Sequence, residues 1–168
     1  TLEELIKHDY EEIIDNIGER NLCGRLAIYL DRMIFNKLDY NGYYVDVEYN
    51  RKQNGKIKTI LDENMEIIPI TCDLILHSRG KKAIDNVIAV EMKKSNRKKS
   101  AKEMDKKRLR AMTKPIDEGI YSADGKLQPE HVCGYLLGVY LEINTKTHKY
   151  LIEFYKDGEC IEDNTFFI

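Results

Sequence analysis

The fold of this chain is decided by residues 70–94, which read ITCDLILHSRGKKAIDNVIAVEMKK. Two short apolar runs, residues 70–77 and 87–93, flank a polar connection that contains glycine. Apolar runs of this length around a polar, glycine-containing turn predict two antiparallel strands joined as a hairpin. Such a hairpin sets Asp73, in the first run, beside Glu91, in the second.

The second run ends in the tripeptide Glu91-Met92-Lys93. Side chains alternate between the two faces of a strand, so Glu91 and Lys93 project from one face and Lys94 from the other. Carboxylates are the hard oxygen ligands that Mg²⁺ and Mn²⁺ prefer, and a nearby ammonium can orient water or neutralise phosphate charge. Together with Asp73, the tripeptide indicates a divalent-metal phosphodiesterase site.

These residues resemble the motif of the PD-(D/E)xK nuclease superfamily, which includes type II restriction endonucleases and many DNA-repair and defence nucleases. Asp73 stands at the first acidic position, Glu91 at the second and Lys93 at the lysine. Cys72 stands where the name of the motif has proline. The match is closer to bacterial members of the superfamily than to a particular restriction enzyme.

The resemblance implies a metal-dependent nuclease that hydrolyses phosphodiester bonds, with DNA favoured as substrate and endonucleolytic cutting favoured over exonucleolytic. Mg²⁺ or Mn²⁺ would be held by Asp73 and Glu91, and the backbone carbonyl of Met92 would complete the set. The implied fold class is α/β (α+β), a restriction-endonuclease-like core. That core is a central mixed β-sheet flanked by helices, in the order α-β-β-β-α-β, here with extra C-terminal strands.

The first 38 residues are predicted to be helical, with one helix over residues 2–17 and a second running to Asn36. Leucines recur at helical spacing in the second, and Met33 extends its apolar stripe. Glu19 falls on the same inner stripe, where a carboxylate needs a partner. It either interacts with the N-terminus of its own helix or leans toward the metal site, as a glutamate on the first core helix does in many superfamily members.

A further helix is expected before Pro115, with Ser100 and Glu103 forming a capping box. Its predicted inner side is Ala101, Met104, Leu109 and Met112, and the predicted outer side carries Lys102, Lys106, Lys107, Arg110 and Lys114. Asp105 also falls on that side, where Arg108 or Lys98 could neutralise it. Before the Asp73 strand, residues 43–49 predict a strand, and a weaker extended segment is expected from Lys58 across residues 62–64. Strands are also predicted over residues 132–141 and 150–155, with a last short one ending at Ile168.

Charge is strongly segregated along the chain. Residues 93–114 hold eleven basic and two acidic residues, a local balance of +9 within a chain of net charge −2. The concentration of basic residues favours a polyanion-binding surface, although many charge runs are only solvated helix faces. The nucleic-acid contacts predicted from this segment are Lys94, Arg97, Lys98, Lys102, Lys106 and Arg110.

The 168 residues are expected to form a single domain, 1–168, with the helical segment 1–38 packed on it. No apolar run approaches the length of a membrane span, and four widely spaced cysteines fit reduced thiols in the cytoplasm. Nucleophile-elbow and phosphate-loop motifs are absent. The rival interpretation is a non-catalytic nuclease-fold module that binds nucleic acid or a protein partner. A homodimer, or a subunit of a larger defence or repair complex, remains open.

Overall fold

The computed structural model describes residues 1–35, 37–50, 59–61, 67–116 and 132–168. Its helical elements are α1 (Leu2–His8), α2 (Tyr10–Ile14), α3 (Glu19–Phe35), the short 3-10 helix η1 (Leu38–Tyr40) and α4 (Lys99–Thr113). Within these residues, no helix has the length and apolar character needed to cross a membrane.

A six-stranded mixed sheet with the order β1-β4-β5-β6-β7-β8 forms the centre of the molecule. Its strands are β1 (Tyr44–Val47), β4 (Leu74–His77), β5 (Asn86–Lys94), β6 (Leu137–Asn144), β7 (Lys149–Lys156) and β8 (Glu159–Phe167). All neighbouring pairs are antiparallel except β5 and β6, because the chain crosses over through α4 between these two strands. The chain is therefore an α+β fold with an open mixed sheet. The predicted fold class, a central mixed sheet flanked by helices, is confirmed.

The segment that precedes β4 differs from the prediction. Instead of one extended segment, the described part consists of two short strands, β2 (Thr59–Leu61) and β3 (Ile67–Pro69), which pair with each other in a separate two-stranded sheet. Residues 58 and 62–64, over which the extension was also predicted, lie outside the described residues.

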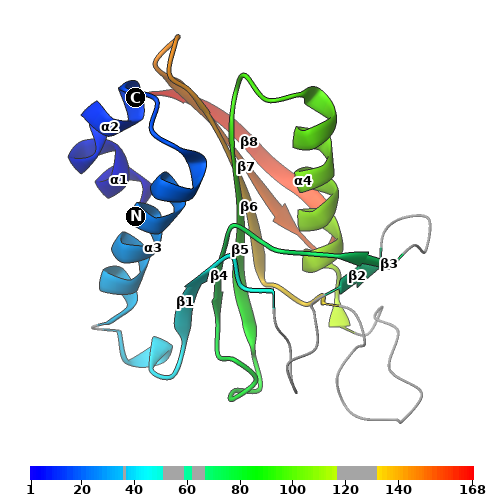
Figure 1. Ribbon diagram of the computed structural model, residues 1–168. Helices are drawn as coiled ribbons and strands as arrows, with labels where there is room; N and C mark the ends of the chain where they lie inside the picture. The colour runs from blue at the N-terminus through cyan, green and yellow to red at the C-terminus, as the bar shows by residue number, and fades with distance from the viewer. Residues whose placement is uncertain (36, 51–58, 62–66, 117–131) are drawn as a thin grey trace.

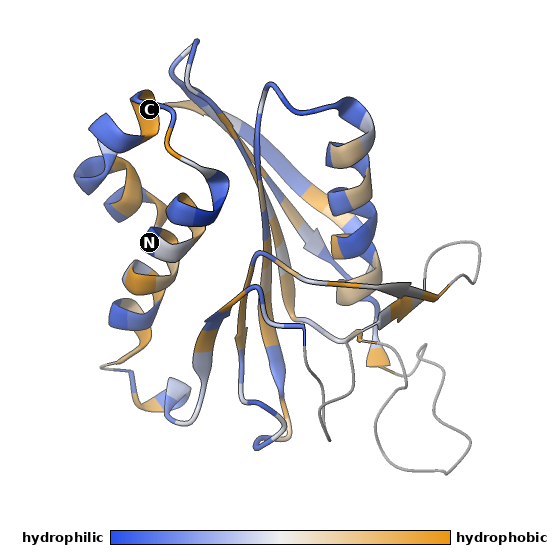
Figure 2. Cartoon of the chain, viewed as in Figure 1, coloured by the Kyte–Doolittle hydropathy of each residue, from blue (hydrophilic) through white to orange (hydrophobic). Residues whose placement is uncertain are grey.

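Helices cover both faces of the main sheet (Figure 1). The period-two alternation of β5 divides its side chains between them: Met92 belongs to the core shared with α1 and α3, and Ala89 to the core shared with α4. Figure 2 shows that α4 carries mostly hydrophilic residues, unlike α3. Charged side chains therefore border the hydrophobic core on the α4 side of the sheet.

The N-terminal helices divide earlier than predicted. Instead of one helix over residues 2–17, α1 ends just before Asp9, whose carboxylate accepts hydrogen bonds from Arg25 Nε (2.6 Å) and the Tyr29 hydroxyl (2.7 Å) on α3. Asp9 is 3% exposed, and these two hydrogen bonds satisfy its buried carboxylate at the point where α1 ends. Met33, predicted on the inner stripe of α3, is 42% exposed.

The predicted orientation of α4 is also partly wrong. The helix starts at Lys99 after Lys98, with no side-chain cap, so Ser100 forms no capping box. Leu109, Met112 and Asp105 are buried as predicted, with Asp105 only 2% exposed, but Met104, also predicted on the inner side, is 43% exposed. The helix is rotated so that basic side chains also face the sheet, where they form ion pairs with acidic residues of the strands.

Candidate active site

Asp73 and Glu91 lie next to each other on paired segments, as the hairpin predicted. The antiparallel register places Leu74 of β4 opposite Val90 of β5, which sets Asp73 across from Glu91. Asp73 comes immediately before the first residue of β4. The backbone N–H of Met92 donates to Asp73 Oδ2 over 2.8 Å, which fixes that carboxylate against β5.

Glu91 is completely buried, with no exposed surface. Its Oε1 accepts a hydrogen bond from Arg108 Nε over 2.8 Å, whereas its Oε2 is buried without a hydrogen-bond partner among the described residues. Burial raises the pKa of Glu91 to about 8, against the opposing effect of the Arg108 charge and with a further upward contribution from Asp73. A buried carboxylate oxygen without a partner is costly, and a bound cation would satisfy it.

Lys93 projects to the same side of the sheet as Glu91, since both side chains contact α4. Its Nζ lies 2.8 Å from Asp105 Oδ2, and its side chain is 17% exposed. Burial lowers the pKa of Lys93, but the Asp105 carboxylate outweighs this effect and the net shift is upward. Lys93 is therefore a protonated, partly accessible ammonium held beside the carboxylate pair.

Two α4 residues, Asp105 and Arg108, were not predicted as site residues. Arg108 donates hydrogen bonds to the carboxylates of Glu91 and Asp105, from Nε to Glu91 Oε1 and from Nη2 to Asp105 Oδ1. The inner-face position of Asp105 was the signal available in the sequence, and Arg108 does pair with it as one of the two alternatives. The other alternative, Lys98, is wrong, because Lys93 makes the second ion pair. Ion pairs of Asp105 and Arg108 with Lys93 and Glu91 thus join α4 to β5.

Glu19 is the first residue of α3 and lies near the end of β5. Its Oε1 accepts hydrogen bonds from the Lys94 backbone N–H (3.0 Å) and from Arg97 Nε (2.8 Å). Burial raises the pKa of Glu19, but Arg97 and the Lys94 amide outweigh this and the net shift is downward. No direct contact with Asp73 or Glu91 is recorded among the described side chains, so these partners satisfy the inner-face carboxylate.

Most of the predicted nucleic-acid contacts already have partners within the protein. Lys102 pairs with Glu142 (2.7 Å) and Lys106 with Glu153 (2.5 Å). Lys94 binds Asn16, Arg97 binds Glu19 and Arg110 binds Glu159. Lys98 is exposed, and no ion pair of it is recorded among the described residues. The local excess of positive charge is therefore partly compensated, by Glu19 of α3, Glu142 of β6, Glu153 of β7 and Glu159 of β8.

The positions of Lys102 and Lys106 also correct their assignment to the outer face of α4. Their side chains are 16% and 21% exposed, and they reach acidic residues on β6 and β7. Lys94 lies on the other face from Glu91 and Lys93, as predicted, because its Nζ binds the backbone oxygen of Asn16 over 2.7 Å.

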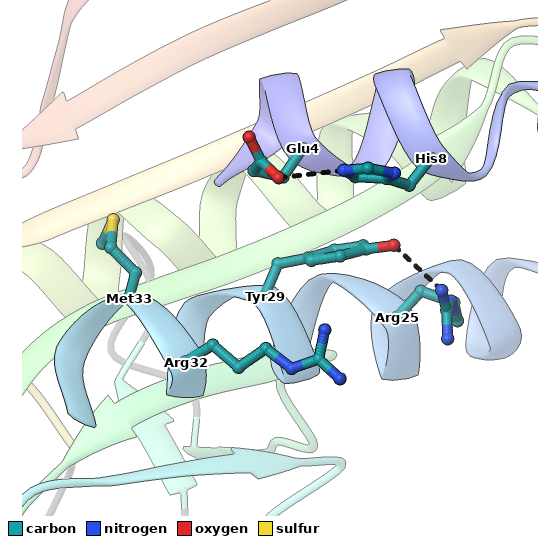
Figure 3. Close-up of a pocket in the computed structure, with 6 residues that line it drawn as sticks. All are labelled: Glu4, His8, Arg25, Tyr29, Arg32 and Met33. Atoms are coloured by element: carbon teal, nitrogen blue, oxygen red, sulfur yellow. Dashed lines mark hydrogen bonds and ion pairs between the residues drawn. The ribbon is translucent and has the colours of Figure 1, made fainter. Parts of the chain in front are cut away.

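A pocket of about 560 Å³ lies away from this cluster, between α1 and α3 (Figure 3). It is lined by Glu4, His8, Arg25, Tyr29, Arg32 and Met33. His8 pairs with Glu4 and Arg25 with Tyr29, as the dashed lines show. The carboxylate pair and Lys93 lie against α4 instead, so the pocket does not include the candidate site.

Neither a preformed metal site nor a related protein identifies the function of this cluster. Within the described ranges, no group of three or more His, Cys, Asp or Glu side chains is arranged to hold a metal ion. Comparisons of the chain with protein-family models, curated proteins and solved structures find no match. The side chains brought together by β4, β5 and α4 are therefore the candidate functional site.

Proposed function

We propose that this protein is a metal-dependent nuclease that hydrolyses phosphodiester bonds, with DNA the favoured substrate and endonucleolytic cutting the favoured mode. The observation that carries the proposal is the placement of Asp73 beside Glu91, with Lys93 on the same face as Glu91. Two hard carboxylates and an ammonium in one cluster supply the charges that hydrolysis of a phosphodiester needs.

The chemistry of these residues fits Mg²⁺ or Mn²⁺. Asp73 and Glu91 offer oxygen ligands, and Glu91 Oε2 is a buried acceptor that lacks a hydrogen-bond partner among the described residues. Asp73, Glu91 and the Met92 carbonyl would hold the ion, and Glu19 would join through a bound water if Arg97 released it. When bound, the metal would lower the pKa of a coordinated water and neutralise phosphate charge.

The remaining residues of the cluster have separate roles in this proposal. Lys93 keeps its proton and presents an ammonium that can orient a water or stabilise charge on the phosphate oxygens. Arg108 balances the Glu91 carboxylate from the α4 side. Asp73 is kept in place by the Met92 amide, so its second oxygen can serve another ligand.

The order of elements supports the same proposal. Helix α3, strands β1, β4 and β5, helix α4 and strand β6 follow one another in the main sheet and its flanking helices, with β2 and β3 inserted before β4. This order is similar to the α-β-β-β-α-β core of restriction-endonuclease-like proteins, with β7 and β8 as additions. A cytoplasmic location belongs to the proposal too, since all four cysteines are free thiols.

A cleavage assay tests the proposal. Wild-type protein, Lys93→Ala and Lys102→Ala are incubated with supercoiled, linear and single-stranded DNA and with RNA, in Mg²⁺ and in Mn²⁺. Lys102 is the matched control because its side chain is 16% exposed and paired with a carboxylate, as that of Lys93 is at 17%. We expect cleavage by wild type and Lys102→Ala and its loss in Lys93→Ala. Equal cutting by Lys93→Ala would overturn the site assignment.

A non-catalytic nuclease-fold module, binding nucleic acid or a protein partner, is the second candidate. One observation favours it: Glu91 and Lys93 are already engaged by Arg108 and Asp105, so the protein neutralises the cluster by itself. This candidate predicts no uptake of Mg²⁺ or Mn²⁺ that depends on Asp73 and Glu91. A homodimer or a larger defence or repair complex is compatible with either candidate.

A further inference from the structure

The ammonium of Lys93 is held by a carboxylate that comes from α4 and not from the strands that carry the motif. Asp105 Oδ2 lies 2.8 Å from Lys93 Nζ. The same carboxylate accepts a hydrogen bond from Arg108 through its other oxygen. Asp105 therefore joins the two cations of the cluster.

The burial of Asp105 makes this contact specific. The residue is 2% exposed, and a charged carboxylate is buried at great cost unless cations surround it. A lysine side chain has several rotatable bonds and on an exposed strand end would sample many conformations. Strand alternation places Lys93 on the same face as Glu91, and the fixed carboxylate of Asp105 restricts where on that face its ammonium lies.

We propose that Asp105 is a positioning residue, which acts through Lys93 by holding its ammonium beside the carboxylate pair of Asp73 and Glu91. This inference rests on the proposed nuclease function. Asp105 binds neither substrate nor metal in this role. Preorganising a charged group before the reaction is a large contribution to phosphoryl-transfer catalysis, so loss of the anchor lowers the rate of the chemical step.

The test compares Asp105→Asn with Glu153→Gln. Glu153 is the matched control because it is also a carboxylate at the interface of α4 with the sheet, 9% exposed and paired with a lysine, Lys106, over 2.5 Å. Each variant is measured for single-turnover cleavage rate, substrate affinity, Mn²⁺ affinity by calorimetry and urea-unfolding midpoint.

We expect the cleavage rate of Asp105→Asn to fall at least tenfold below that of Glu153→Gln, while the Kd values for substrate and Mn²⁺ stay within threefold of wild type. A rate within threefold of the control would overturn the positioning role. A tenfold loss of Mn²⁺ affinity would also overturn it, because Asp105 would then act as a ligand.

A second measurement keeps the inference testable if Asp105→Asn fails to fold. In metal-free wild-type protein at low temperature, a restrained Lys93 ammonium gives a slowly exchanging ¹H–¹⁵N signal, which is assigned by its disappearance in Lys93→Ala. Absence of that signal in wild type would overturn the inference. Lack of cleavage by wild type under all conditions would instead refute the proposed function, and the catalytic consequence of the anchor with it.

Discussion

Arg108 donates from Nε to Oε1 of the fully buried Glu91 over 2.8 Å, and so brings a positive charge from α4 onto a strand in the middle of the sheet. This contact leaves Glu91 Oε2 as a buried oxygen with no hydrogen-bond partner in the described part of the chain. The metal-free protein is therefore less stable than it would be if that carboxylate oxygen were hydrogen-bonded, and the oxygen stays available to a ligand.

The buried position of Glu91 predicts an unusual pH dependence. Its pKa is raised from 4.5 in the unfolded chain to about 8 in the fold, so the unfolded chain loses the proton first as the pH rises. Unfolding is then favoured progressively between these two pH values. Because a glutamine side chain cannot titrate, the stability of Glu91→Gln relative to wild type should increase across this window, by on the order of 4 kcal/mol.

Urea unfolding of both proteins in EDTA at pH 4.5, 6 and 8 measures this difference. A stability difference that does not change with pH would show that Glu91 ionises as easily in the fold as in the unfolded chain.

Glu19 should show the opposite sign. Burial raises its pKa, but the Arg97 side chain and the Lys94 amide outweigh burial and lower it. Its ionised form therefore stabilises the fold above pH 4.5, and this stabilisation is lost on acidification. Glu19→Gln should lower the free energy of unfolding by about 1 kcal/mol at pH 7 and by much less near pH 3, as urea unfolding at both pH values measures. Glu48→Gln is the control, because Glu48 pairs with Arg20 on the open surface and should change stability less at either pH.

The basic residues should differ in their importance for DNA binding. Lys98 and Lys99 are exposed, whereas Lys102 and Lys106 are neutralised by Glu142 and Glu153. Replacing Lys98 and Lys99 by alanine should weaken binding and lower the slope of log Kd against log salt by about 2, since each phosphate contact contributes about 0.9. Replacing Lys102 and Lys106 should lower the slope less. Fluorescence anisotropy at several salt concentrations, in Ca²⁺ to limit cleavage, measures both; equal slopes in the two double variants would contradict the ranking.

Gly138 should be essential for the close packing of α4 on β6. A Cβ at this position would lie 3.0 Å from Thr113 Cγ2 and 3.1 Å from Tyr155 Cβ. Gly138→Ala is expected to destabilise the protein by about 1–3 kcal/mol, because the added methyl overpacks the interface. Gly24→Ala on α3 is the matched control: its Cβ meets nothing within 4 Å, and alanine in a helix should be stabilising by roughly 0.5–1 kcal/mol. Thermal unfolding measures both, and a neutral Gly138→Ala would mean that α4 can move away from the sheet.

The carboxylate pair and its lysine could be placed from the sequence because both depend on local rules. The hairpin between residues 70 and 94 fixed the register of Asp73 against Glu91, and the period of a strand placed Lys93 on the same face as Glu91. The residues that hold these groups could not be placed in the same way. Helical spacing placed both Asp105 and Met104 on the inner side of α4, but only Asp105 is buried there. The exact rotation of α4 and the pairing of Asp105 with Lys93 depend on contacts with the sheet.

The ion pairs that neutralise part of the basic segment 93–114 also could not be predicted from neighbouring residues in the sequence. The acidic partners of Lys102 and Lys106 are Glu142 and Glu153, which reach α4 only because β6 and β7 pair beneath it. Counting charges along the chain gives an excess of positive charge in this segment, whereas Lys102 and Lys106 form ion pairs in the folded protein. The break between α1 and α2 has a similar origin, since Arg25 and Tyr29 on α3 bind Asp9.

A calorimetric titration tests most directly whether Asp73 and Glu91 form a divalent-metal site. Mn²⁺ is titrated at pH 8 into wild-type protein, Asp73→Asn, Glu91→Gln and the control Glu153→Gln. We predict saturable binding by wild type and the control, and loss of that binding in both Asp73→Asn and Glu91→Gln. Absence of Mn²⁺ binding by wild type, or equal binding by all four proteins, would show that Asp73 and Glu91 do not form such a site.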